Sequence, residues 1–184
     1  YDRCALVVLL HEVEVFNVIT RLPPSVACGM VSLDAPVVVQ QREPAVDYQA
    51  VQTEDQLEAL IAVLEEASSF SFDTKTTRLN PMRVDLVGLS FSVEPGRAWY
   101  LPVGHTEGEQ LPLETVLARI RPLMESTELA KCAHNANYDV TVLANHGILC
   151  QNVDFDTMIA AHLLHTGALG LKNLSLNLIG HQLT

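Results

Sequence analysis

A chain of 184 residues that is 48% hydrophobic can bury a core of its own, which argues against a disordered segment and favours one globular domain with an extension. Its formal net charge of −11 is not typical of a free-standing nucleic-acid binder, although a local acidic site for metal ions is compatible with it. The longest apolar run, residues 5–10, is far too short to span a bilayer, and no signal-peptide pattern is visible.

The first 46 residues differ from the rest of the chain in their sequence pattern. Residues 2–22 place apolar side chains at helical spacing, which favours a helix, although the valines leave a strand possible. Prolines at positions 23, 24, 36 and 44 indicate an extended linker. We therefore expect a helical segment over 1–22, a linker over 23–46 and a compact domain over 47–184. Because the chain starts with Tyr1 and not with methionine, we expect it to be part of a longer protein.

The predicted domain combines strands and helices. Thr53 is a predicted N-cap with Gln56 at the capping-box position, and the helix that follows, 54–67, has one apolar stripe. Alternation in LVGLSFSV and turn residues at 94–97 predict a hairpin. The expected strands are 48–52, 70–74, 85–93, 97–103 and 129–134, and the other expected helices are 113–124, 136–146, 157–165 and 171–179, with Gly147 as a C-cap. This order predicts an α/β fold with a mixed sheet and helices on its faces.

Cysteine and histidine do not form a recognisable metal site. The four cysteines, at positions 4, 28, 132 and 150, show no CxxC spacing, and the seven histidines show no HExxH pattern. We therefore expect no zinc, and thiols that are reduced and mostly buried, as in a cytosolic protein.

Three aspartates lie where chemistry is possible. Asp73 closes a predicted buried strand in SFSFDTKTTRLNP, at a position where a nuclease would hold a metal ion. Asp139 lies in the first turns of a predicted helix, where a surface residue interacting with the helix dipole is an equal alternative. Asp156 precedes an apolar helical run, so a helix cap is its simplest interpretation. Asp73 is therefore the strongest single candidate.

Four segments carry a family resemblance: FDTKTTRLNP, VDLVGLSFSVEPGRAWYLPVGH, KCAHNANYDVTVLANHGI and FDTMIAAHLL. Together they resemble the 3′–5′ exonuclease domain of the family A DNA polymerases, the bacterial DNA polymerase I type, over about residues 48–184. The upstream segment YDRCALVVLLHEVEVFNVITRLPP is similar to the stretch preceding this domain in those polymerases, which separates the chain from other DEDD-type exonucleases. The resemblance implies a ribonuclease H-like mixed sheet flanked by helices, and a monomeric piece of a bacterial cytoplasmic protein with no membrane partner. It also implies flanking 5′ nuclease and polymerase domains, and DNA as the partner.

Domains of this family hydrolyse the 3′-terminal phosphodiester with two divalent ions, Mg²⁺ or Mn²⁺, held by acidic side chains. The resemblance implies that Asp73 bridges both ions, and that Asp139, the last residue of the intact Asn-x-x-Tyr-Asp motif, helps to hold the second. Lys75 stands where the family's Asp-x-Glu motif has its glutamate. An ammonium group repels a divalent ion, so we expect weak or absent metal binding. Lys75 could pair with Asp73 or Asp139, or could point into solvent.

The family's third motif, Tyr-x-x-x-Asp, has no match here, because neither tyrosine nor aspartate occurs after Asp156. We expect that motif to lie beyond Thr184. The resemblance further implies nucleic-acid contacts from Thr74, Leu79, Asn135 and Tyr138. Leu79 matches an apolar residue that wedges near the terminal base, with plain packing as the alternative, and Tyr138 is expected to pack in the core in preference to stacking on a base.

Three functional hypotheses follow. The first is a degenerate exonuclease domain that serves as a structural module between the 5′ nuclease and polymerase domains. The second is an active two-metal proofreading exonuclease that tolerates Lys75. The third is a module that binds single-stranded DNA without cleaving it, which needs a basic surface that the composition does not indicate.

Overall fold

The structure of the chain is a computed structural model and describes residues 46–183. The predicted helix over 2–22 and nearly all of the predicted linker lie outside the described residues. No helix in the described part of the chain is both long and apolar enough to cross a membrane.

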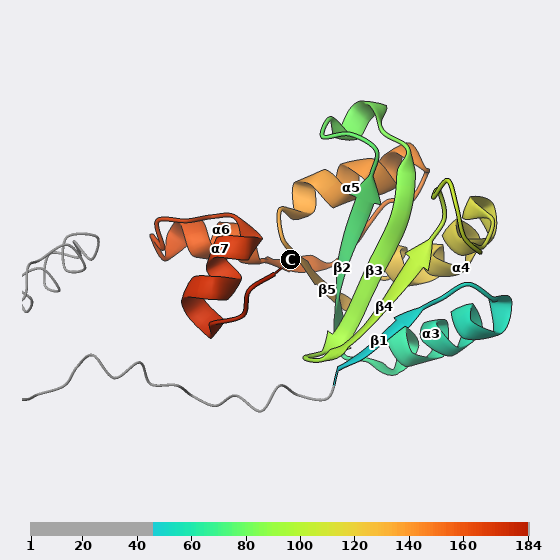
Figure 1. Ribbon diagram of the computed structural model, residues 1–184, viewed down its shortest axis with the longest axis horizontal. Coiled ribbons are helices and arrows are strands. Elements are labelled where there is room, and N and C mark those ends of the chain that lie inside the picture. The colour runs from blue at the N-terminus through green and yellow to red at the C-terminus, as the bar shows by residue number, and fades with distance from the viewer. Residues whose placement is uncertain (1–45, 184) are drawn as a thin grey trace, which may run out of the picture. The chain divides into compact units, whose positions relative to one another are not determined.

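A six-stranded mixed sheet forms the centre of the domain, in the order β1-β4-β3-β2-β5-β6 (Figure 1). Strand β3 is antiparallel to both of its neighbours, β2 and β4, and the other neighbouring strands run parallel. The strands are β1 (Asp47–Ala50), β2 (Ser69–Thr76), β3 (Leu86–Glu94), β4 (Arg97–Pro102), β5 (Ala130–Ala133) and β6 (Val153–Asp156). This confirms the predicted mixed sheet, except that β6 was not predicted, because its sequence VDFD has too few apolar residues to signal a strand.

One face of the sheet packs against three helices, α3 (Glu54–Glu66), α4 (Leu113–Glu125) and α5 (Ala136–Asn145), of which α5 passes behind β2 and β3 in Figure 1. Phe70 and Phe72 of β2 and Phe91 of β3 point into this core, and the Phe70 and Phe91 rings meet edge to face with 5.7 Å between their centroids. Since side chains alternate along a strand, Ser71, Asp73 and Lys75 of β2 point to the opposite face.

Local signals in the sequence explain how several helices begin and end. The predicted capping box is confirmed: Thr53 accepts a hydrogen bond from the Gln56 backbone N–H, and the Gln56 side chain accepts one in return. The predicted C-cap Gly147 follows α5 with a φ of 76°, a conformation that favours glycine.

The C-terminal helices are shorter than the sequence predicts. Helix α6 is Thr157–Leu163, and the predicted helix over 171–179 is a short α7 (Leu171–Leu174) followed by a π-helical turn, η2 (Ser175–Ile179). A 3₁₀ turn, η1 (Pro81–Arg83), was not predicted and lies in the loop between β2 and β3. This loop borders the site described next.

Candidate functional site

A shallow depression of about 380 Å³ lies where β2, the β2–β3 loop and the start of α5 meet. All of the residues that the sequence and the family resemblance singled out for the site line this one depression, together with Thr76, His134 and Met158. The predicted residues are Asp73, Thr74, Lys75, Leu79, Asn135, Tyr138 and Asp139. The fold thus brings together residues that are up to 66 positions apart, since 139 − 73 = 66.

Asp73 and Lys75 form an ion pair on the sheet face that points away from the core. Residues two apart on a strand share a face, and the Lys75 Nζ lies 2.6 Å from the Asp73 Oδ2. The Asp73 side chain is 45% exposed and the Lys75 side chain 59%. The Asp73 Oδ2 atom itself, however, is shielded from solvent and has no hydrogen-bond partner. The charge contact with Lys75 is therefore the interaction that compensates this oxygen.

Asp139 is the buried carboxylate of the site, with 3% of its surface exposed. Its Oδ1 accepts hydrogen bonds from the Thr74 backbone N–H, at 2.7 Å, and from the Thr74 hydroxyl, at 2.6 Å. Burial raises the pKa of Asp139 above its ordinary value, the Thr74 bonds lower it in part, and the nearby Asp73 charge raises it again. Thr74 is itself buried, and both of its donors are directed at Asp139, so it supports this carboxylate.

Tyr138 anchors the β2–β3 loop. Its hydroxyl donates to the Arg78 backbone carbonyl at 2.7 Å and lies 2.5 Å from the Thr76 hydroxyl, while its ring packs partly against the core. Leu79, next in the loop, is 93% exposed, so plain packing does not explain this residue. The loop therefore presents an apolar side chain at the rim of the depression.

Asp156 holds the start of α5 as well as that of α6. Its Oδ1 accepts from the N–H groups of Asn135, Met158 and Ile159, and its Oδ2 accepts from that of Ala136 at 2.8 Å. The predicted cap on α6 is confirmed. Burial raises the pKa of Asp156, but the four N–H groups outweigh it and the net pKa is below the ordinary value. Asn135 adopts a left-handed conformation (φ 63°) and makes no side-chain cap, so Asp156 supplies the cap that α5 lacks.

Tyr100, on β4, and His105, in the segment that follows β4, form a pair that the sequence did not indicate. The Tyr100 hydroxyl lies 2.7 Å from the His105 Nε2. Burial raises the pKa of Tyr100, while the Lys75 charge lowers it and the Asp73 charge raises it, so the phenol lies within electrostatic range of the ion pair. The Tyr100 ring covers Gly88, the residue that pairs with Lys75 across the sheet.

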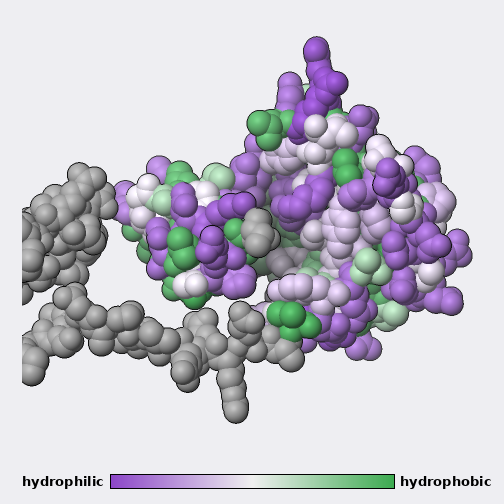
Figure 2. Space-filling model, in the orientation of Figure 1, coloured by the Kyte–Doolittle hydropathy of each residue, from purple (hydrophilic) through white to green (hydrophobic). Residues whose placement is uncertain are grey.

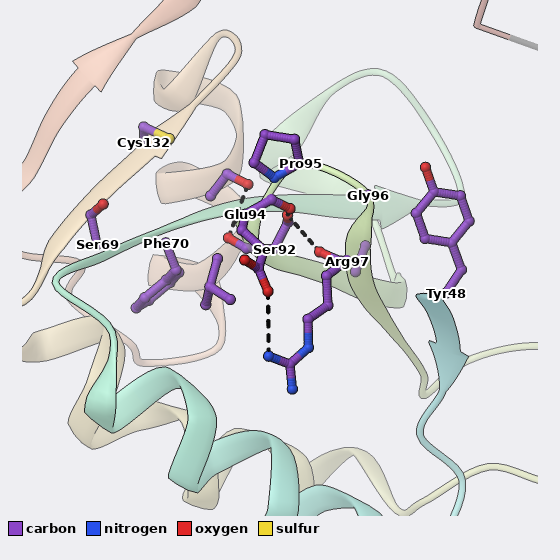
Figure 3. Close-up of a pocket in the computed structure, with 12 residues that line it drawn as sticks. Tyr48, Ser69, Phe70, Ser92, Glu94, Pro95, Gly96, Arg97 and Cys132 are labelled. Atoms are coloured by element: carbon purple, nitrogen blue, oxygen red, sulfur yellow. Dashed lines mark hydrogen bonds and ion pairs between the residues drawn. The ribbon is translucent and has the colours of Figure 1, made fainter. Parts of the chain in front are cut away.

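A second depression, of about 350 Å³, lies at the opposite end of β2 and is drawn in Figure 3. Its basic residue, Arg97, is already engaged: the guanidinium contacts Glu94 and Asp47 and stacks over Trp99 at 4.8 Å from the ring centroid. Because this positive charge is paired, the pocket offers a ligand little to bind.

The described residues do not fit a two-metal centre. Residues 46–183 contain no group of three or more His, Cys, Asp or Glu side chains that could hold a metal ion. The two carboxylates of the depression are both engaged, Asp73 by the Lys75 ammonium and Asp139 by Thr74. A hard divalent cation needs several free oxygen ligands, and a neighbouring ammonium opposes it.

The sheet order and the helices that pack on one face of the sheet define a ribonuclease H-like fold. A model of the 3′–5′ exonuclease domain of family A DNA polymerases matches residues 48–184, and the chain belongs to this family. It is 34% identical to DNA polymerase I of Chloroflexus aurantiacus, over 95% of this chain and 21% of that protein. It is 33% identical to DNA polymerase I of Pseudomonas aeruginosa, over 98% of this chain and 20% of that protein. The chain therefore spans about a fifth of the length of these relatives.

Solved structures support the fold independently. The catalytic core of RRP6 from Trypanosoma brucei superposes with a TM-score of 0.60 at 20% identity, over 76% of this chain and 36% of that one. At this identity the likeness concerns the fold alone. It matches the ribonuclease H-like sheet that the family resemblance implies.

Proposed function

We propose that this chain is the exonuclease-type domain of a bacterial, cytoplasmic DNA polymerase I, and that its metal-dependent proofreading activity is lost or very weak. In this proposal it acts as a structural module between a 5′ nuclease domain and a polymerase domain. The observation that carries the proposal is the contact of 2.6 Å between the Lys75 Nζ and the Asp73 Oδ2. This supports the proposal, because the ammonium group already neutralises the carboxylate that the family resemblance assigns to metal binding.

The electrostatic cost of a metal ion beside Lys75 is large. A +1 charge and a +2 charge about 4 Å apart repel by about 2 kcal/mol in bulk water and about 8 kcal/mol at an effective dielectric constant near 20. Since both side chains of the pair are about half exposed, the lower end of this range applies. Even about 2 kcal/mol weakens a metal ion's binding by about 30-fold, because 1.4 kcal/mol corresponds to a factor of ten.

The second carboxylate of the site, Asp139, does not offset the repulsion between Lys75 and a metal ion. Asp139 is buried, and its raised pKa means that forming the carboxylate is less favourable there than in water. It is stabilised by Thr74, so an incoming cation would have to compete with two short hydrogen bonds. Mg²⁺ or Mn²⁺, the ions that domains of this family use, would therefore bind poorly if at all at this pair of aspartates.

The test uses the complete natural protein that contains this chain and its Lys75→Glu variant. We expect no removal of a mismatched 3′ nucleotide by the natural protein with Mg²⁺ or Mn²⁺, and measurable removal by Lys75→Glu. Lys172→Glu, which makes the same charge change on an exposed residue of α7, is the matched control and should remain inactive.

The outcomes separate the alternatives. Inactivity of both natural protein and Lys75→Glu means that the site has decayed beyond one residue, which still supports a structural role. Efficient cleavage by the natural protein refutes the proposal and establishes a working proofreading exonuclease that tolerates Lys75.

A further inference from the structure

The C-terminal elements leave most of their large apolar side chains exposed. Of residues 157–183, which contain α6, α7 and η2, only Ala161, Leu174 and Ser175 are buried. Six apolar side chains of this segment, here called the C-terminal apolar surface, are each between 50% and 75% exposed: Ile159, Leu163, Leu164, Leu176, Leu178 and Ile179. In Figure 2 the lobe at the left of the view, formed by α6 and α7 in Figure 1, shows hydrophobic side chains among hydrophilic ones. Exposed apolar side chains gathered on one part of a protein mark an interaction site.

The same segment is almost free of charge. With histidine counted as neutral, residues 157–183 contain one charged side chain, Lys172, in a chain with 22 acidic residues and 11 lysines and arginines. Permanent protein–protein interfaces are more apolar than other surfaces, and charged residues are depleted at their cores. A partner that fits the C-terminal apolar surface is therefore apolar and nearly uncharged as well.

A groove beside α7 extends this surface onto the sheet. The groove has a volume of about 290 Å³, and Leu171 of α7 lines it together with small side chains on the sheet face opposite to α3, α4 and α5, among them Ser71, Ser92 and Ala98. The Ser71 hydroxyl donates to the Ser92 carbonyl at 3.3 Å, and the Ser92 hydroxyl donates to the Arg97 carbonyl at 2.7 Å. Because both hydroxyls already have acceptors, an apolar cover would leave neither of them buried without a partner.

The charge of the chain favours an attached partner over a second copy. Each copy carries a formal net charge of −11, and like charges oppose the approach of two copies. A partner in the same polypeptide does not depend on protein concentration, because the linker keeps it at a high effective concentration. This chain makes up 21% and 20% of the two DNA polymerase I relatives, so most of such a protein lies outside it.

We propose that the C-terminal apolar surface and the groove beside Leu171 form a docking surface for another part of the same polypeptide, which presents an apolar and nearly uncharged face to it. The inference rests on the proposed function in taking this chain as one module of a longer polymerase, and it names the surface through which the module is joined to its neighbour. It does not depend on whether the site at Asp73 and Asp139 hydrolyses DNA.

The test is carbene labelling of aliphatic side chains in the complete natural protein, read by mass spectrometry. The yield at each residue is divided by the yield at the same residue in the urea-unfolded protein. Residues at the core of an interface lose nearly all of their exposure, so Leu164 and Leu176 should give less than about a tenth of their unfolded yield. Yields of about half or more, as their exposure in this chain alone predicts, would overturn the inference.

Leu163→Glu/Ile179→Glu places two carboxylates in the proposed interface and should raise the labelling of Leu164 and Leu176 at least about five-fold, because an unpaired buried charge is unfavourable. Val46→Glu/Leu149→Glu makes the same charge change on residues that are 60% and 63% exposed elsewhere, and should leave that labelling unchanged. No rise in the first variant, or an equal rise in both, would contradict the inference.

Sedimentation velocity of the natural protein separates an attached partner from a second copy. We expect a monomer with the surface protected, whereas protection that appears only in a dimer would assign the surface to a second copy and overturn the inference. Removal of a mismatched 3′ nucleotide by the natural protein would refute the proposed loss of activity and leave the labelling result unchanged.

Discussion

Removing the Asp156 carboxylate tests whether one side chain holds two helices at the site. Asp156→Ala leaves four backbone N–H groups, two at the start of α5 and two at the start of α6, without their acceptor. Loss of a helix cap costs about 1 kcal/mol, and hydrogen bonds to a charged group contribute about 1.5–3 kcal/mol each before water replaces them. Because water can reach these partly exposed groups, we expect the free energy of unfolding to fall by about 2–4 kcal/mol.

Urea unfolding followed by circular dichroism measures this loss. Asp156→Asn keeps one acceptor oxygen and should lose about half as much. Asp154→Ala, on an exposed aspartate of the same strand, is the matched control and should change stability by less than about 0.5 kcal/mol. A loss for Asp156→Ala no larger than that of the control would refute the view that this carboxylate caps both helices.

The pH dependence of the same variant gives a second check. The pKa of Asp156 is lowered in the folded protein, so its stabilisation is fully present above its ordinary pKa of 3.8 and is lost as the pH falls through the lower, folded value. The difference between the natural chain and Asp156→Ala should therefore shrink in acid. A difference that stays constant down to the acid unfolding of both proteins would contradict the charge-based account.

Three further predictions concern side chains around the sheet. Burial lowers the pKa of Lys131, so the free energy of unfolding should rise as the pH increases from the folded pKa toward 10.5, and Lys131→Met should abolish this rise in pH-dependent urea unfolding. In Gly88→Ala the new methyl carbon would lie 2.1 Å from the Tyr100 hydroxyl, which should destabilise the domain by about 1–3 kcal/mol, with recovery in the Gly88→Ala/Tyr100→Ala double variant. Thr74→Val removes one donor to Asp139 and should raise the pKa of that carboxyl further, as measured by carbon NMR titration; an unchanged titration would show that the backbone N–H alone holds it.

Features that depend on neighbours in the sequence could be predicted from the sequence itself. The Thr53–Gln56 capping box joins residues three apart, and the alternation of LVGLSFSV puts the apolar residues of β3 on one face. The same period of two predicts that Asp73 and Lys75 lie side by side on one face of β2, where they form an ion pair. Strand β6 was not predicted because its alternating sequence, VDFD, is only four residues long and half acidic, which is too short a pattern to indicate a strand.

Contacts between distant segments required the tertiary structure, because they depend on how the sheet and helices pack. Thr74 and Asp139 are 65 positions apart, and no local pattern in the sequence predicts that Thr74 donates its hydrogen bonds to the Asp139 carboxylate. Asp156 reaches Ala136, 20 positions upstream, only because β6 lies beside β5. The sequence determined which residues carry charge. The packing decided which of those charges are neutralised. Arg97, Arg119 and Arg121 are therefore paired with carboxylates, whereas Arg78 and Arg83 remain exposed at the rim of the site.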